Sequence, residues 1–208
     1  MTDLFPPIWT VVPDGTRGRA TVRHVTVTEE QSRFTCLRGR RSYVQAGTYA
    51  QLLVSGELVM SDTPYERSSN YEVVHRATGR VLIAGYGIGM ILTAILKKPD
   101  VSEVLVVERE SDVLSLVDPA IRRYVGPRAA KKLVVLHADI FNCRRLLTWP
   151  FDCIYFDIWS NASTDALTEM TALMRKYRAL KRSKESFMDC WDREWLRYYR
   201  RAQRRSEW

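Results

Sequence analysis

A glycine-rich turn in the middle of the chain has the spacing of a nucleotide-binding loop. Gly85, Gly87 and Gly89 form a G-x-G-x-G turn directly after the apolar run 80–84. Glycines in such a turn let the backbone approach a ligand closely and direct helix N–H groups toward it. Met90 stands where the dinucleotide fingerprint G-x-G-x-x-G has its third glycine, so the spacing disfavours NAD.

Each of the three apolar runs that come after the glycine turn has an acidic residue at its end or shortly after it. Glu108 comes 23 residues after Gly85, where a carboxylate can accept both hydroxyls of a ribose; a surface glutamate at a strand end is the alternative interpretation. Asp139 follows the third run, where it could accept a proton of an adenine amino group. Asp157 ends the fourth run, at the edge where open α/β sheets bind ligands.

The elements that must position these residues alternate between strands and helices. Strands are predicted at 80–84, 104–108, 133–136 and 152–157, and their apolar character is typical of a parallel sheet buried on both faces. Strands alternating with helices imply β-α-β units with right-handed crossovers. After 157 the pattern predicts helices only.

The fold class expected is therefore α/β, with a Rossmann-like, mainly parallel sheet truncated after its fourth strand. The predicted regions are a small β extension at 1–60, a Rossmann-like nucleotide-binding core at 61–162, and a helical basic region at 163–208. The helices of the last region are predicted at 165–180 and 184–204.

The junction between the extension and the core carries helix signals. Asp62 is expected to cap the start of a helical turn that has Pro64 near its beginning. The stretch 68–78 is expected to be a helix that Gly79 closes as a C-terminal cap.

The stretch from Met60 to Trp159, about half the chain, resembles the class I methyltransferases that depend on S-adenosylmethionine (AdoMet), and within them the spermidine synthase-like branch; by this resemblance the core at 61–162 binds AdoMet. The resemblance implies AdoMet or decarboxylated AdoMet as cofactor, with glycines on the methionine side, Glu108 at the ribose and Asp139 at adenine. The stretch 56–66 also resembles small spermidine synthase-like proteins, many of them carried by bacteriophages, and so favours a phage source. The cofactor-binding residues implied are Gly85, Tyr86, Gly87, Gly89, Glu108, Asp139 and Asp157.

The sequence also departs from this family. Polyamine synthases have a pair of acids after the fourth strand, whereas here Asp157 is followed by Ile158, Trp159 and Ser160. The acid or Asn followed by Pro-Pro-Tyr or Pro-Pro-Phe of several N-methyltransferases is absent too. Methyl transfer is therefore the preferred reaction, because it requires little beyond holding the nucleophile close to the sulfonium and in line with it. Aminopropyl transfer is the alternative, and a non-catalytic AdoMet-binding or nucleic-acid-associated protein is an alternative of another class.

Side chains near the glycine turn could serve a small-molecule acceptor. Asp157 is the catalytic candidate, because a carboxylate can accept a proton from an attacking amine or orient it. Asp62, Tyr65 and Trp159 are the predicted substrate-binding residues. Tyr86, Trp159 or Tyr65 could contact the sulfonium through a cation–π interaction, although core packing is the favoured interpretation for each ring.

The formal net charge is +8, and the excess lies in the tail, between 175 and 205. Such a basic tail could bind nucleic acid, or it could be a solvated helix face. Aromatic residues at helical spacing in the tail predict a stripe that packs on the body or on a second copy in a homodimer, with an aromatic platform for a ligand as the alternative interpretation. The stripe consists of Phe187, Trp191, Trp195, Tyr198 and Tyr199.

Composition narrows the remaining classes. The 208 residues suit one domain with extensions, and no apolar run has the length of a membrane span. The first 13 residues lack the basic and apolar regions of a secretory signal, so a cytoplasmic location is expected. The four cysteines and three histidines are scattered, which predicts free thiols and no metal site.

Overall fold

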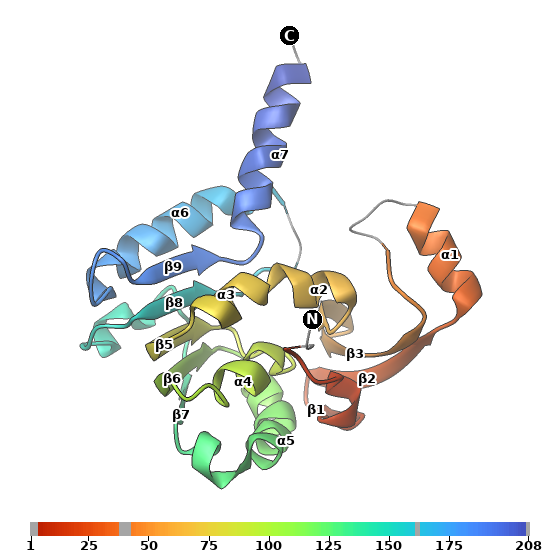
Figure 1. Cartoon of the computed structure of the whole chain (residues 1–208), viewed down its shortest axis with the longest axis horizontal. Coiled ribbons are helices and arrows are strands. Elements are labelled where there is room, and N and C mark those ends of the chain that lie inside the picture. The colour runs from red at the N-terminus through yellow and green to blue at the C-terminus, as the bar shows by residue number, and fades with distance from the viewer. Residues whose placement is uncertain (1–3, 38–42, 161–162, 207–208) are drawn as a thin grey trace.

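Two β-sheets and the helices that cover them make up the fold (Figure 1). The structure, a computed structural model, describes residues 4–37, 43–160 and 163–206. The larger sheet is parallel throughout and has the strand order β7-β6-β5-β8-β9. Its strands are β5 (Gly79–Ala84), β6 (Val101–Glu108), β7 (Leu133–His137), β8 (Cys153–Phe156) and β9 (Phe187–Cys190).

This strand order confirms the predicted α/β, Rossmann-like fold class. Counted along the chain, the order is 3-2-1-4-5, so the direction of winding reverses between β5 and β8. Open α/β sheets bind ligands at the carboxyl ends of the strands on either side of such a reversal. The registers pair Ala84 with both Val107 and Phe156, which brings the ends of β5, β6 and β8 together.

The apolar runs form strands because both faces of the parallel sheet are buried. Val81 and Ile83 of β5 belong to one core cluster, whereas Leu82 and Ala84 belong to another. Side chains alternate between the two faces of a strand, so a strand covered on both sides needs apolar residues at every position.

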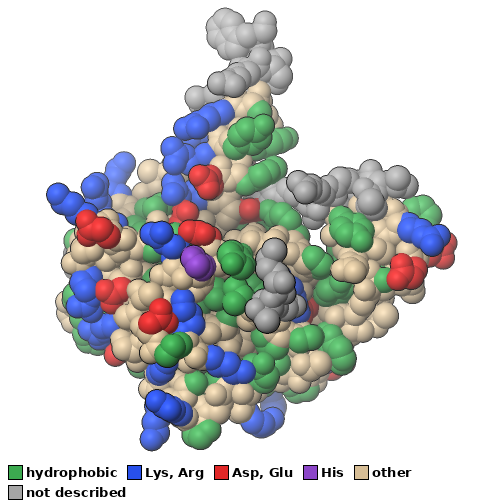
Figure 2. Space-filling model, viewed as in Figure 1, with side chains coloured by type: hydrophobic (Ala, Val, Ile, Leu, Met, Phe, Trp, Pro, Cys, Tyr) green, Lys and Arg blue, Asp and Glu red, His purple; other side chains and the backbone are tan. Residues whose placement is uncertain are grey.

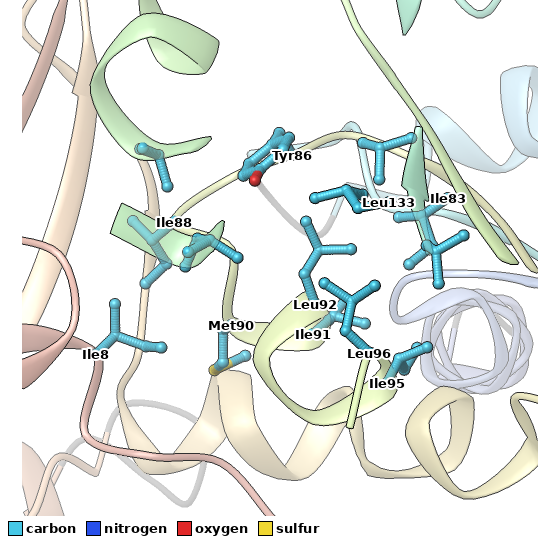
Figure 3. Packing of buried hydrophobic residues seen from close by; sticks show 14 of the residues in the cluster. Ile8, Ile83, Tyr86, Ile88, Met90, Ile91, Leu92, Ile95, Leu96 and Leu133 are labelled. Carbon is cyan, nitrogen blue, oxygen red and sulfur yellow. The ribbon is translucent and has the colours of Figure 1, made fainter. Parts of the chain in front are cut away.

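Helices pack against both faces of the parallel sheet and complete these two clusters. The cluster that holds Ile83 also contains Leu92 and Ile95 from α4 and Val117 from α5 (Figure 3). The opposite face packs against α6 through Met170 and its neighbours. The helices are α1 (Glu29–Leu37), α2 (Pro64–Ser69), α3 (Tyr71–Arg76), α4 (Met90–Ile95), α5 (Ser111–Ala130), α6 (Ala166–Tyr177) and α7 (Arg193–Ser206). Three 3₁₀ turns complete them: η1 (Ile8–Thr10), η2 (Cys143–Leu146) and η3 (Arg178–Leu180).

The smaller sheet is antiparallel, in the order β1-β2-β3-β4, and realises the predicted N-terminal β extension. Val22 and Leu52 of this sheet are buried in the same cluster as α4 and α5. The extension therefore shares a core with the face of the parallel sheet on which it lies. Its strands are β1 (Gly15–Arg17), β2 (Ala20–Val27), β3 (Gly47–Val54) and β4 (Glu57–Ser61).

Asp62 fastens this extension to the rest of the chain. Its side chain is fully buried and accepts hydrogen bonds from the backbone N–H groups of Ile8 and Ala50, both at 2.7 Å. The Arg67 guanidinium lies 3.1 Å from the same carboxylate. The expected helix-capping role of Asp62 is wrong: Thr63 occupies the N-cap of α2, and the acid is committed to these buried partners.

The predicted helix 68–78 is interrupted. Asn70 separates α2 from α3, and its side-chain NH₂ donates to the Glu66 carbonyl while its side-chain oxygen accepts from the buried Tyr155 hydroxyl. Gly79 does not cap a helix; it begins β5 with φ of 58°, where a Cβ would overlap the Asp152 carboxylate. Tertiary packing thus overrides the local helix signal.

The prediction of helices only after Asp157 is also wrong. A fifth strand, β9, pairs in parallel with β8 from Cys153 opposite Phe187 to Phe156 opposite Cys190, so the sheet is not truncated after its fourth strand. Backbone hydrogen bonds to a strand remote in sequence outweigh the helical spacing of the aromatic residues. The predicted stripe is therefore divided, with Phe187 on β9 and Trp191 at its end.

Three further findings bear on the predictions. Cys143, Cys153 and Cys190 are free and buried, while the side chain of Cys36 lies outside the described residues. The predicted domain boundary at 162 also falls outside them, and the division into three regions stays a prediction. Among the helices described, none is long and apolar enough to cross a bilayer.

Replacing Asp62 by alanine is expected to lower the free energy of unfolding by about 3 kcal/mol or more, because the Arg67 charge and two buried N–H groups lose their partner. Urea denaturation followed by circular dichroism measures this change. Asp100→Ala, which removes an exposed aspartate, serves as the matched control. Equal unfolding midpoints for the two variants would contradict the structural role of Asp62.

Candidate functional site

A cavity of about 630 Å³ lies between the carboxyl ends of the parallel strands and the antiparallel sheet. One wall consists of the glycine turn and the residues that follow β6, β7 and β8. The other wall comes from β3 and β4. The predicted site residues that line the cavity are Gly85, Gly87, Glu108, Asp139, Asp157 and Trp159.

The three glycines of the turn all have left-handed backbone angles, with φ of 98° at Gly85, 52° at Gly87 and 72° at Gly89. A Cβ at Gly85 would overlap the carbonyl oxygen of Asp157, and one at Gly87 would overlap the Met60 sulfur. Glycine is thus required at each position for both conformation and space. Gly89 is not among the described cavity-lining residues; it begins α4, with its Cα packed toward α5.

Glu108 is fixed by backbone amides on both sides. One carboxylate oxygen accepts from the N–H of Tyr86 at 2.7 Å, and the other accepts from the N–H of Glu110 at 2.8 Å. The residue is only 9% exposed, and what is exposed lines the cavity. A carboxylate has about four acceptor positions, so these two bonds leave one lone pair on each oxygen for a ligand with two adjacent hydroxyls.

Asp139 is held by the turn that follows it. Its carboxylate accepts from the backbone N–H of Phe141 at 2.8 Å and from the side-chain NH₂ of Asn142 at 2.7 Å. The turn places Asp139 on the cavity wall beside Ala138 and Ile140. An oriented carboxylate next to apolar side chains suits a flat heterocycle with an exocyclic amino group.

Asp157 lies at the point where the winding of the sheet reverses. Its backbone N–H donates to the Ala84 carbonyl at 2.8 Å, which continues the pairing of β8 with β5. Burial raises the pKa of its carboxyl from 3.8 to about 7, and the negative charge of Asp192 adds to this shift. A carboxyl with a pKa near 7 can both release and accept a proton at neutral pH.

Asp192 follows β9 in a left-handed conformation, with φ of 57°. The Tyr65 hydroxyl donates to its carboxylate at 2.5 Å. The next residue back, Trp191, lines the cavity and donates its indole N–H to Ser69 at 3.0 Å. The end of the fifth strand thus places a second acid, Asp192, where its charge acts on Asp157. The sequence pattern alone assigned Asp192 to a helix.

Besides Gly89, three predicted site residues are not among the described residues that line the cavity. Asp62 is buried in the structural network above, and Tyr65 contacts Asp192. Tyr86 packs its ring in the core, where its hydroxyl donates to Asp118 at 2.9 Å. Core packing, the favoured interpretation of this ring, is therefore confirmed, and it is the backbone N–H of Tyr86 that donates to Glu108.

Sequence reasoning missed the residues that come from outside the Rossmann core. Arg19, from the turn between β1 and β2, lines the cavity, as does Met60 from β4. Their placement depends on how the antiparallel sheet docks, which no local pattern shows. A signal existed for Asp192: had 187–190 been interpreted as a strand, an acid at its carboxyl end would have joined the other strand-end acids.

The cavity wall is strongly acidic. Seven carboxylates line it, against two arginines, Arg19 and Arg109. Both guanidiniums lie within 4 Å of the same acid, Glu110, at 3.8 Å and 3.4 Å. The site therefore favours a cationic ligand and disfavours phosphates. The acidic residues are Glu57, Glu66, Glu108, Glu110, Asp139, Asp157 and Glu169.

Comparison with known proteins gives similarities to solved structures only. No family model matches the sequence, and no curated protein matches it. The chain is similar to precorrin-6y C5,15-methyltransferase from Geobacter metallireducens, with 12% identity and a TM-score of 0.45 over 59% of this chain and 61% of that protein. It is similar to the N-methyltransferase NodS from Bradyrhizobium japonicum, with 14% identity and a TM-score of 0.43 over 58% and 64%.

A third similar structure is spermidine synthase from Thermotoga maritima, with 19% identity and a TM-score of 0.43 over 64% of this chain and 46% of that protein. The chain spans less than two thirds of each of these proteins. They are of the two kinds that the sequence resemblance names, methyltransferases and a spermidine synthase. The fold class itself rests on the strand order and parallel register of the sheet.

The raised pKa of Asp157 predicts a pH-dependent contribution to stability. Between pH 3.8 and about 7 the folded protein keeps this proton while the unfolded chain loses it. The contribution of Asp157 to folding is therefore largest below pH 3.8, decreases through this window, and levels off above it. Denaturant titrations at several pH values, compared with Asp157→Asn, should show the stability difference between the two proteins falling over that range.

Asp192→Asn provides a second test. Removing this neighbouring charge lowers the pKa of Asp157, so the pH range over which stability decreases should become narrower. A stability difference that stays constant with pH would show that Asp157 titrates normally.

Proposed function

We propose that the protein is an AdoMet-dependent transferase that moves a methyl group to a small-molecule acceptor. The observation that carries the proposal is the Glu108 carboxylate, which two backbone amides hold at the end of β6, beside a turn of three left-handed glycines. This combination suits the adjacent hydroxyls of a ribose. A carboxylate at this strand end also favours an unphosphorylated ribose, because a phosphate would be repelled.

The residues present fit AdoMet as cofactor. Glu108 would accept from the ribose hydroxyls, Asp139 from the adenine amino group, and Gly85 and Gly87 would leave room for the methionine portion. AdoMet supplies a methyl group that its sulfonium makes electrophilic. The excess of carboxylates around the cavity stabilises that positive charge and has less attraction for the neutral sulfide that remains after transfer.

Asp157 would act on the acceptor. Asp157 lines the same cavity as Gly85, and its pKa near 7 lets its carboxyl accept the proton that an amine or hydroxyl loses when it bonds to the methyl group. Trp159, whose indole N–H donates to Glu169 at 3.1 Å, lines the same side of the cavity and would limit the shape of the acceptor.

Aminopropyl transfer is the second candidate, and it is favoured by Asp192, whose negative charge is near enough to raise the pKa of Asp157. A polyamine acceptor carries more than one positive charge, and two acids with the Tyr65 hydroxyl could hold one ammonium group while a neighbouring amine reacts. The second acid that the sequence lacks after the fourth strand is thereby supplied from the fifth. Decarboxylated AdoMet has no carboxylate to oppose the acidic wall, which is consistent with the same candidate.

Glu108→Ala is expected to weaken AdoMet binding about tenfold to a hundredfold, because a buried charged acceptor for two hydroxyls is lost. Isothermal titration calorimetry measures the change, and near-UV circular dichroism checks that the variant is folded. Glu72→Ala, on the exposed surface of α3, is the matched control. Unaltered affinity in a folded Glu108→Ala variant would refute the ribose assignment, and no binding by the unchanged protein would refute AdoMet as cofactor.

Comparing how tightly the protein binds AdoMet and decarboxylated AdoMet distinguishes the two transferase candidates. If the protein transfers aminopropyl groups, the decarboxylated form should bind at least about tenfold more tightly, and putrescine should be consumed in its presence. Asp192→Asn should then raise the KM for putrescine more than it lowers kcat. Equal or tighter binding of AdoMet itself, with putrescine unchanged, excludes this candidate and leaves methyl transfer.

A further inference from the structure

The last helix, α7, stands away from the body of the protein. It begins two residues after Trp191 at the cavity edge, and its C-terminal end projects into solvent (Figure 1). Its base is anchored in the core: Leu196 is fully buried against α6, and Trp195 packs beside it. From Arg197 to Gln203 every residue is exposed. Half of this helix therefore has a surface that its own domain does not cover.

The exposed part of α7 has a basic flank. Arg200 and Arg201 lie three and four residues after Arg197, so all three share one side of the helix. Figure 2 shows this cationic flank along the projecting helix, with hydrophobic side chains on the opposite flank. Arginine occupies six of the 14 positions of α7, and Glu194 is its single acidic residue.

The opposite flank is aromatic. Tyr198 is 69% exposed and Tyr199 is 43% exposed. The Tyr199 ring stacks on Trp195, with ring centroids 5.0 Å apart and an angle of 11° between the planes. Flat, exposed rings beside guanidiniums offer the two contacts that an unpaired nucleotide makes, stacking of the base and pairing of the phosphate.

We propose that α7 binds single-stranded nucleic acid, with Arg197, Arg200 and Arg201 at the phosphates and Tyr198 as a stacking surface for a base. The charge of the helix selects a polyanion. A lipid surface fits less well, because Tyr198, Tyr199, Ala202 and Gln203 lack the long aliphatic chains that insert into a bilayer. A second copy of this chain fits less well too, since two arginine-rich helices repel each other.

Fluorescence anisotropy with a labelled single-stranded RNA of about 12 nucleotides tests this proposal; the length exceeds the roughly 21 Å of a 14-residue helix. The experiment contains no AdoMet, so its outcome is independent of the proposed transferase activity. The variant Arg197→Glu/Arg200→Glu/Arg201→Glu is expected to weaken binding at least about tenfold. The slope of log K against log salt concentration should become shallower by about 2, as three phosphate contacts are lost.

The matched control is Arg123→Glu/Arg128→Glu/Lys131→Glu, which changes the net charge equally at exposed positions on and directly after α5. This control should keep most of the affinity. Equal losses in the two triple variants would overturn the proposal, because binding would then follow net charge alone. Circular dichroism verifies that both variants are folded.

The tyrosine contact has its own test. Tyr198→Ala should weaken RNA binding about fivefold or more, while Tyr198→Phe, which keeps the ring, should not. Duplex RNA of the same length should bind less tightly, because its bases are already stacked. Binding of anionic vesicles without binding of RNA would overturn the proposal, as would a dimer in sedimentation that Tyr198→Ala dissociates while RNA is not bound.

Discussion

The site depends on the close approach of β5, β6 and β8 at the end of β5. Gly85 donates its N–H to the Val107 carbonyl at 2.9 Å, while Asp157 donates its N–H to the Ala84 carbonyl at 2.8 Å. A side chain at Gly85 would overlap the backbone of Asp157, so the two strand ends can meet only because this residue is glycine. The glycine turn, Glu108 and Asp157 all take their positions from this junction.

Burial has opposite consequences for the two acids at that junction. Glu108 accepts two backbone N–H bonds, which stabilise the charged carboxylate and fix its orientation. Asp157 is half-buried and within reach of the negative charge of Asp192, and desolvation and this charge raise its pKa to about 7. One carboxylate is thus suited to hold a ligand and the other to exchange a proton, although both are acids at the ends of parallel strands.

The antiparallel extension does more than cover the sheet. It contributes Arg19, Met60 and the outer wall of the cavity, and Asp62 ties it to the N-terminal segment through Ile8. A cofactor bound at the strand ends would therefore be enclosed by residues from the first 60 positions. The acidic lining of this enclosure and the basic surface of α7 place the negative and positive charge of the protein in two separate regions.

The sequence by itself determined the parallel sheet and the strand-end residues. Apolar runs buried on both faces, glycines that need left-handed angles, and acids directly after strands are local features, and Gly85, Glu108, Asp139 and Asp157 lie where these features predict. The tertiary structure decided the rest. The run 187–190 became a strand because β8 offered a free edge, and Asp62 and Tyr86 became structural because buried partners remote in sequence bind their side chains. Such pairings depend on contacts across the fold, which local spacing does not encode.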